Sequence, residues 1–178
     1  MADLSITGST RRANDCSTAG GKRLLAHIFG FALLLGMAIQ PLEASTDVDE
    51  LLARAEAPSG VVFEIVEADE GALEDLLPKV RDAIRKLRAR FPEAGFAVVS
   101  HGREEFALQS QYRSEYAEVH DQVQSLVAAD VPVHVCETHA GWYGVTAEDF
   151  PEYVNVAPTG PGQINLYREL GYELIIVD

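Results

Sequence analysis

Val131 to Gly144, VPVHVCETHAGWYG, is the stretch around which the rest of the chain is organised. Valines alternate with other residues up to Cys136, and two glycines follow shortly after it. This pattern predicts a β-strand that delivers a thiol into a glycine-rich loop. Ligands of open α/β sheets bind outside the carboxyl ends of the strands, so Cys136 is a candidate reactive residue. The alternative is that Cys136 is a buried, unreactive core residue, because free cysteine often packs as a small hydrophobe.

Segments of strand and helix character alternate along the chain. We expect strands at Val61–Glu67, Phe96–Ser100, Val131–Val135, Val154–Val156 and Tyr172–Val177. Apolar residues at three- and four-residue spacing predict helices at Leu73–Phe91 and Tyr116–Val127, a short helix starting at Thr146 and a last one from Pro158–Gly162 to Leu170. Parallel neighbours need crossover connections, so the prediction is a three-layer α/β/α domain with a mostly parallel sheet of about five strands. His120, beside the second helical stripe, is expected to be exposed.

The first 44 residues have the order of a secretory signal. Two basic residues precede the apolar run Leu24–Ile39, and small residues follow at the expected cleavage site near Ala44. The apolar run is marginal for a bilayer span of about 20 residues. The sequence therefore predicts a signal peptide at 1–44 and a periplasmic or secreted protein, with an uncleaved membrane anchor as the alternative. A linker or short helix at 45–60 and an α/β domain at 61–178 follow.

Cysteine usage and charge narrow the function further. Cys16 leaves with the predicted leader, which makes Cys136 the sole thiol of the mature protein and excludes an internal disulfide. The chain has a net charge of −14, which argues against nucleic-acid binding. Six of its 14 basic residues lie between positions 79 and 90. They form either a solvated helix face or a docking surface for an acidic protein.

Several of these segments resemble motifs of the DsrE/DsrF-like family, which includes the YchN-like proteins. Val98–Gly102 (VVSHG) resembles the family's strand ending in His-Gly, and Val133–Cys136 (VHVC) resembles the strand that ends in its cysteine. Gly144–Val145 with the acidic segment Thr146–Phe150 resembles its Gly-Ile and short helix, and Val154–Val156 with Gly160 its next strand and turn. The resemblance implies a compact α/β subunit that assembles into homotrimers or hexamers. It also implies that Cys136 forms a persulfide and exchanges sulfur with donor and acceptor proteins or small sulfur compounds.

A persulfide site needs a thiol that ionises. A neighbouring imidazolium lowers the pKa of a thiol from about 8.5. His101 and His139 are the two candidates for that role and for moving a proton. Trp142 and Tyr143 are candidates for a wall that shields the terminal sulfur, or for a subunit interface. Tyr143 stands where many family members have an arginine, and Arg103 is the nearest candidate to replace that cation.

Two other functions are alternatives to the persulfide hypothesis. Cys136 and His139 have ligand types and spacing suited to zinc or copper, with His101 or Glu67 completing the site. A non-catalytic binding module would hold a small anion at Gly160–Gly162. The persulfide hypothesis requires neither a metal nor a cofactor. A serine hydrolase has no support because the sequence lacks a G-x-S-x-G motif.

Overall fold

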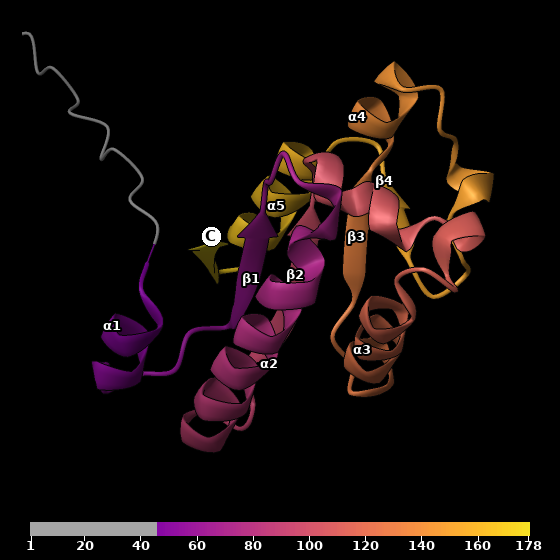
Figure 1. Cartoon of the computed structure of the whole chain (residues 1–178). Coiled ribbons are helices and arrows are strands. Elements are labelled where there is room, and N and C mark those ends of the chain that lie inside the picture. The colour runs from indigo at the N-terminus through magenta and orange to yellow at the C-terminus, as the bar shows by residue number, and fades with distance from the viewer. Residues whose placement is uncertain (1–45) are drawn as a thin grey trace, which may run out of the picture. The chain divides into compact units, whose positions relative to one another are not determined.

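The computed structural model describes residues 46–178, which form one parallel sheet flanked by helices (Figure 1). The order across the sheet is β4-β3-β2-β1-β5, and every pair of neighbouring strands is parallel. The strands are β1 Gly60–Ile65, β2 Gly95–Ser100, β3 Val133–Cys136, β4 Asn155–Ala157 and β5 Tyr172–Val177. This confirms the predicted three-layer fold. The predicted leader, its apolar run and its cleavage site lie outside the described residues.

Five α-helices connect or flank the described strands. They are α1 Val48–Ala53, α2 Leu73–Arg90, α3 Ala117–Ala128, α4 Glu137–Trp142 and α5 Gly160–Glu169. Short 3₁₀ turns are formed by Glu70–Ala72, Arg103–Leu108, Ser110–Tyr112 and Ala147–Asp149. Within the described part of the chain, no helix has both the length and the apolar content needed to cross a membrane.

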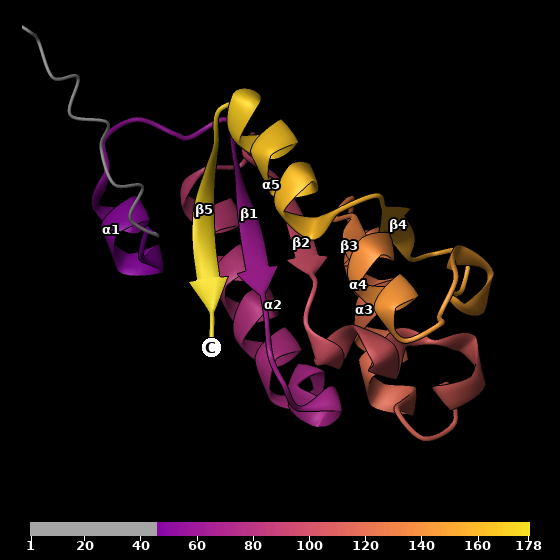
Figure 2. The same ribbon diagram turned by 90° about the horizontal axis from the view of Figure 1, so that it is seen from above.

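The two faces of the sheet are covered differently (Figure 2). Alternate residues of β1 point to opposite faces, so Phe63 joins the larger core beneath α2 and α3 whereas Val62 joins a small core beneath α5. The larger core also holds Leu51 of α1. The smaller core contains one buried residue of α5, Ile164, with Tyr167 packed beside it. The strand ends at the carboxyl edge lie between these two layers.

Local signals explain most element boundaries. The apolar stripe of α2 is buried along the helix, as the sequence pattern predicts. Pro78 lies inside α2 and does not end the helix. Gly171 follows α5 with a φ of 84°, a left-handed conformation that glycine adopts readily. The predicted start of a short helix at Thr146 is a 3₁₀ turn closed by a reciprocal capping box with Asp149.

Two local predictions are wrong. The segment after Cys136 is not a glycine-rich loop but helix α4, because the Cys136 sulfur caps its first turn and Ala140 is buried beneath it. His120 is fully buried rather than exposed. Its ring nitrogens contact the Tyr153 hydroxyl at 2.5 Å and the Ala107 carbonyl at 3.0 Å, which satisfies both polar atoms away from water.

Candidate functional site

The predicted site residues come from the carboxyl ends of neighbouring strands. The register of β2 and β3 pairs Ser100 with Val135. His101 follows the last residue of β2 and Cys136 is the last residue of β3, so both lie at the same edge of the sheet. This is the edge at which parallel α/β sheets bind ligands.

Cys136 is the last residue of β3 and the residue before α4. Its Sγ accepts a hydrogen bond from the backbone N–H of His139 at 3.3 Å. Only 4% of the residue is exposed, and its sulfur is not in a disulfide. The fold thus presents Cys136 as a buried thiol with one hydrogen-bond donor.

Glu105 contacts both Cys136 and His139, two of the predicted site residues. It lies in the 3₁₀ turn after β2 and is fully buried. Its Oε2 accepts the backbone N–H of Cys136 at 2.7 Å, and its Oε1 is 2.8 Å from Nδ1 of His139. A single carboxyl group therefore joins the turn that carries the thiol to the nearest histidine.

Burial strongly perturbs this carboxyl group. Removal from water raises the pKa of Glu105 from 4.5 to about 7, and the nearby charge of Glu104 adds to the rise. Hydrogen bonds from Cys136 and His139 oppose the rise without cancelling it. Strongly shifted groups gather at functional sites, so Glu105 belongs among the candidate site residues.

The adjacent Glu104 is equally buried but serves a different part of the edge. Its carboxylate accepts hydrogen bonds from the Ser100 hydroxyl at 2.7 Å, the Gly102 N–H at 3.0 Å and the Glu67 N–H at 2.7 Å. Glu104 therefore ties the end of β1 to the end of β2. It has no hydrogen bond to Cys136 or His139 among those that the described residues form.

Aromatic rings surround the imidazole of His139. Phe106 stacks on it with ring centroids 5.5 Å apart, and Tyr143 and Trp142 lie at 5.3 and 5.6 Å. Phe106 is buried, whereas Trp142 is 75% and Tyr143 53% exposed. The predicted aromatic pair therefore borders His139 and faces outward.

His101 lies at the same edge as Cys136, just past the end of β2, but its ring is engaged elsewhere. Its Nε2 lies 2.7 Å from Oε1 of Glu64 on β1, and its Cβ and ring pack on Gly160 at the start of α5. A methyl group at Gly160 would come within 2.5 Å of the His101 Cβ, so glycine is needed for this close approach. The structure brings His139, rather than His101, into the hydrogen-bond network of the thiol.

The structure also places the residues of the alternative metal and anion sites and the candidate cation Arg103. No group of three His, Cys, Asp or Glu side chains within residues 46–178 is placed to hold a metal ion. At the start of α5 the Thr159 hydroxyl accepts the Gly162 N–H at 3.1 Å, which is a helix cap. Arg103, the candidate cation, pairs with Glu70 at 2.5 Å and lies 5.7 Å from the centre of the Tyr143 ring.

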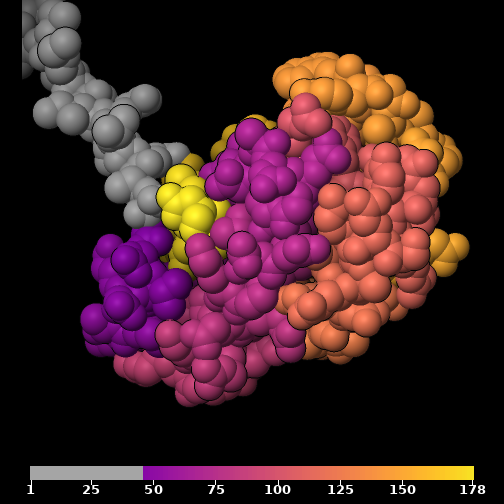
Figure 3. Space-filling view, in the orientation of Figure 1, coloured from indigo at the N-terminus to yellow at the C-terminus, as the bar shows by residue number. Residues whose placement is uncertain are grey.

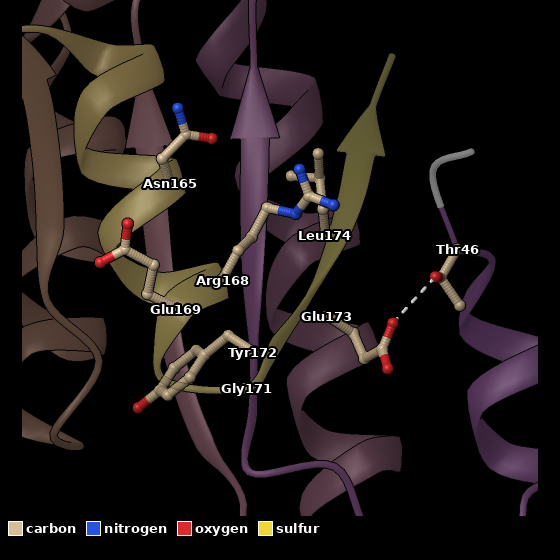
Figure 4. Close-up of a pocket in the computed structure, with 8 residues that line it drawn as sticks. All are labelled: Thr46, Asn165, Arg168, Glu169, Gly171, Tyr172, Glu173 and Leu174. Atoms are coloured by element: carbon tan, nitrogen blue, oxygen red, sulfur yellow. Dashed lines mark hydrogen bonds between the residues drawn. The ribbon is translucent and has the colours of Figure 1, made fainter. Parts of the chain in front are cut away.

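Several cavities lie away from this edge, among them one beside β5 and one between α2 and α3. The larger, of about 600 Å³, is at the start of β5 and the end of α5, where Glu173 accepts a hydrogen bond from Thr46 at 3.2 Å (Figure 4). It contains none of the predicted site residues. The second, of about 410 Å³, lies between α2 and α3, which run side by side (Figures 1 and 3), and three arginines of the basic segment line it: Arg81, Arg85 and Arg88.

Sequence reasoning identified Cys136 and His139 but missed Glu105. The segment Arg103-Glu104-Glu105 is highly charged, which normally indicates an exposed turn, and no local pattern marks either glutamate as buried. Both become buried because each accepts backbone hydrogen bonds from a strand end distant in sequence. Only the tertiary arrangement reveals that signal.

Fold and site together define an α/β protein with a doubly covered parallel sheet and a cysteine, histidine and glutamate cluster at its carboxyl edge. No known family model matches the sequence, and no curated protein matches it. Among solved structures it is similar to a protein of unknown function, MTH1491 from Methanobacterium thermoautotrophicum. The sequences are 27% identical, with a TM-score of 0.53, over 65% of this chain and 96% of that one.

Proposed function

We propose that the protein is a sulfur carrier or sulfurtransferase that uses Cys136 as its persulfide-forming residue. The observation that carries the proposal is the hydrogen-bond network of this thiol. The sulfur accepts the His139 N–H, and a buried carboxyl group contacts both the Cys136 backbone and the His139 ring. Two of these contacts, the His139 N–H to the sulfur and the Glu105 contact to the His139 ring, do not serve the backbone of Cys136.

The chemistry of the proposed step is a sulfur exchange. The Cys136 thiol loses its proton, and the thiolate attacks the outer sulfur of a donor persulfide. The sulfur–sulfur bond of the donor breaks as the new one forms, and the departing donor thiolate takes up a proton. No net oxidation occurs. The roles of a proton acceptor and of a hydrogen-bond donor to sulfur therefore suit the groups around Cys136.

The wider setting of this function follows from the sequence resemblance. We propose a DsrE-like homo-oligomer, exported to the periplasm or secreted, that receives sulfur from a donor protein or a small sulfur compound and passes it to an acceptor. Trp142 and Tyr143 are exposed beside His139 and are suited to contacting a partner or a second subunit.

The test is the intact mass of the protein after exposure to polysulfide or thiosulfate without reductant. The full chain carries Cys16→Ser, so that Cys136 is its sole thiol. We expect a gain of whole sulfur atoms that a reducing agent removes, that Cys136→Ser abolishes and that His139→Ala slows. Undiminished sulfur gain in the folded Cys136→Ser variant would refute the proposal. So would a folded, fully reduced protein that takes up no sulfur.

A further inference from the structure

Glu105 has an unusual position for a glutamate, because it is fully buried and contacts two groups of the Cys136 site. Its two oxygens lie 2.7 Å from the Cys136 backbone nitrogen and 2.8 Å from Nδ1 of His139. The Cys136 N–H is always a donor. Its oxygen partner at Glu105 must therefore be an acceptor.

The contact between Glu105 and Nδ1 of His139 restricts the tautomer of the histidine. An ionised carboxylate can only accept hydrogen bonds, so Nδ1 of His139 must carry a hydrogen when Glu105 is ionised. In a neutral imidazole the other nitrogen, Nε2, then has no hydrogen and is free to accept a proton. The geometry of one buried carboxylate thus determines which nitrogen of the histidine is basic.

We propose that Glu105 is the positioning residue of the Cys136 site, holding His139 as its Nδ1–H tautomer so that Nε2 accepts the proton released when the thiol ionises. The same carboxylate fixes the turn that carries the sulfur, through the Cys136 N–H. After the transfer, His139 is an imidazolium paired with ionised Glu105, and the proton returns to the departing thiolate. The inference rests on the proposed function only in assigning a proton acceptor to the same thiol.

The charges around Glu105 are consistent with this role. Glu104 is the neighbouring carboxyl group in the same 3₁₀ turn, and Cys136 and His139 face Glu105 from the end of β3 and from α4. Burial raises the pKa of Glu105 to about 7, so the ionised form that this role requires prevails above neutral pH.

The first test reads the tautomer of His139 by ¹⁵N NMR of its ring in the full chain with Cys16→Ser. We expect Nδ1–H at pH 8 in the parent protein. In Glu105→Gln the amide oxygen can still accept the Cys136 N–H, but its NH₂ group must then donate to Nδ1, so the hydrogen moves to Nε2. Retention of Nδ1–H in the folded Glu105→Gln variant would overturn the proposal.

The second test measures the rate at which iodoacetamide alkylates Cys136 between pH 5 and 9. We expect Glu105→Gln to slow alkylation at pH 7 by about tenfold or more, because Nε2 of His139 then carries a hydrogen and no longer accepts the thiol proton. Glu104→Gln is the matched control, since it removes an equally buried carboxylate that has no hydrogen bond to Cys136 or His139. Loss of its charge favours ionised Glu105, so we expect no slowing of alkylation. An unchanged or faster rate in Glu105→Gln would overturn the proposal.

A double-variant comparison separates positioning from general damage to the fold. If Glu105 acts through the histidine, Glu105→Gln has little further effect on alkylation once His139→Ala is present. Equal slowing in both backgrounds would overturn the assignment. Neither the tautomer nor the alkylation measurement uses a sulfur donor. A protein that fails to take up sulfur but shows the expected tautomer would refute the proposed function and leave this inference standing.

Discussion

The carboxylate of Glu105 lies 2.7 Å from the backbone nitrogen of Cys136, although the two residues are 31 positions apart in the chain. The contact joins the 3₁₀ turn after β2 to the end of β3. It connects adjacent strand ends through a side chain at the edge where backbone pairing of the two strands ends. The fold therefore places a buried carboxyl group where the Cys136 N–H at the sheet edge requires an acceptor.

This burial makes stability depend on pH. The folded-state pKa of Glu105, about 7, is above the 4.5 of the unfolded chain, so the folded protein binds the proton more tightly. Glu105 therefore stabilises the fold fully below pH 4.5, and this contribution is lost as pH rises to about 7. The loss amounts to about 3 kcal/mol. We expect Glu105→Gln to gain stability relative to the parent protein over this range, as measured by urea unfolding at several pH values.

The comparison of Glu105→Gln with the parent protein isolates Glu105, because other groups titrate in a similar pH range. Burial lowers the pKa of His120 and of His134, so both make the fold more stable as pH rises toward 6.5, opposite to Glu105. Their contributions cancel when Glu105→Gln is compared with the parent protein. A stability difference that stays constant from pH 4.5 to 7 would show that Glu105 is not buried in its neutral form at low pH.

Gly160 packs against His101 too closely to accept a side chain. A methyl group there would lie 2.5 Å from the His101 Cβ and 2.6 Å from its Cγ. We expect Gly160→Ala to destabilise the fold by about 1–3 kcal/mol, because α5 must shift away from β2. The midpoint of denaturant unfolding measures the loss.

Gly141→Ala is the matched control for that substitution. Gly141 lies in α4, and a methyl group there would meet no atom within 4 Å. Alanine favours a helix over glycine, so we expect Gly141→Ala to be neutral or stabilising by up to about 1 kcal/mol. Equal losses in the two variants would contradict the proposed steric cause.

The fold was predictable from the sequence because its signals are local. The apolar run in Tyr172–Val177, rich in β-branched residues, gives a strand with the predicted limits, and the stripe of Leu73–Arg90 gives α2. The helices between successive strands then provide the crossover connections that parallel pairing needs. The segment after Cys136 was misjudged because its glycines indicate a loop, whereas the capping sulfur and buried Ala140 stabilise a short helix.

The site was only partly predictable, for a physical reason. Cys136 and His139 lie three residues apart after a clear strand, so their proximity follows from the chain itself. Glu105 and His120 are polar residues whose burial depends on partners distant in sequence, the Cys136 backbone for one and Tyr153 for the other. Propensity and periodicity contain no information about such partners. A sequence pattern therefore assigns both residues to the surface.

His120 also provides a prediction about stability. The Tyr153 hydroxyl is 2.5 Å from its Nδ1, and the Ala107 carbonyl accepts from Nε2 at 3.0 Å. We expect Tyr153→Phe to cost about 1–2 kcal/mol, because a buried ring nitrogen loses its partner. Thermal unfolding measures the change. Tyr112→Phe is the control, since the Tyr112 hydroxyl makes no hydrogen bond with the residues that the structure describes, and a similar loss there would contradict the explanation.

Trp142 provides the last prediction, on self-association. Its side chain is 75% exposed beside His139, and large exposed aromatic residues are often central to interfaces. We expect Trp142→Ala to leave the unfolding free energy of the subunit within about 0.5 kcal/mol of the parent value. We also expect it to weaken the proposed homo-oligomer by about tenfold or more, as measured by sedimentation equilibrium.

Leu170→Ala is the comparison that locates the interface. Leu170 is 67% exposed at the end of α5, away from Cys136 and His139. Weaker association in Trp142→Ala alone would place the subunit contact beside the thiol, where a second subunit would limit access to Cys136. Weaker association in Leu170→Ala alone would contradict the prediction for Trp142 and place the contact on the α5 face. Trp142 would then be free to contact a sulfur donor, and its substitution should slow transfer from a protein donor more than transfer from polysulfide.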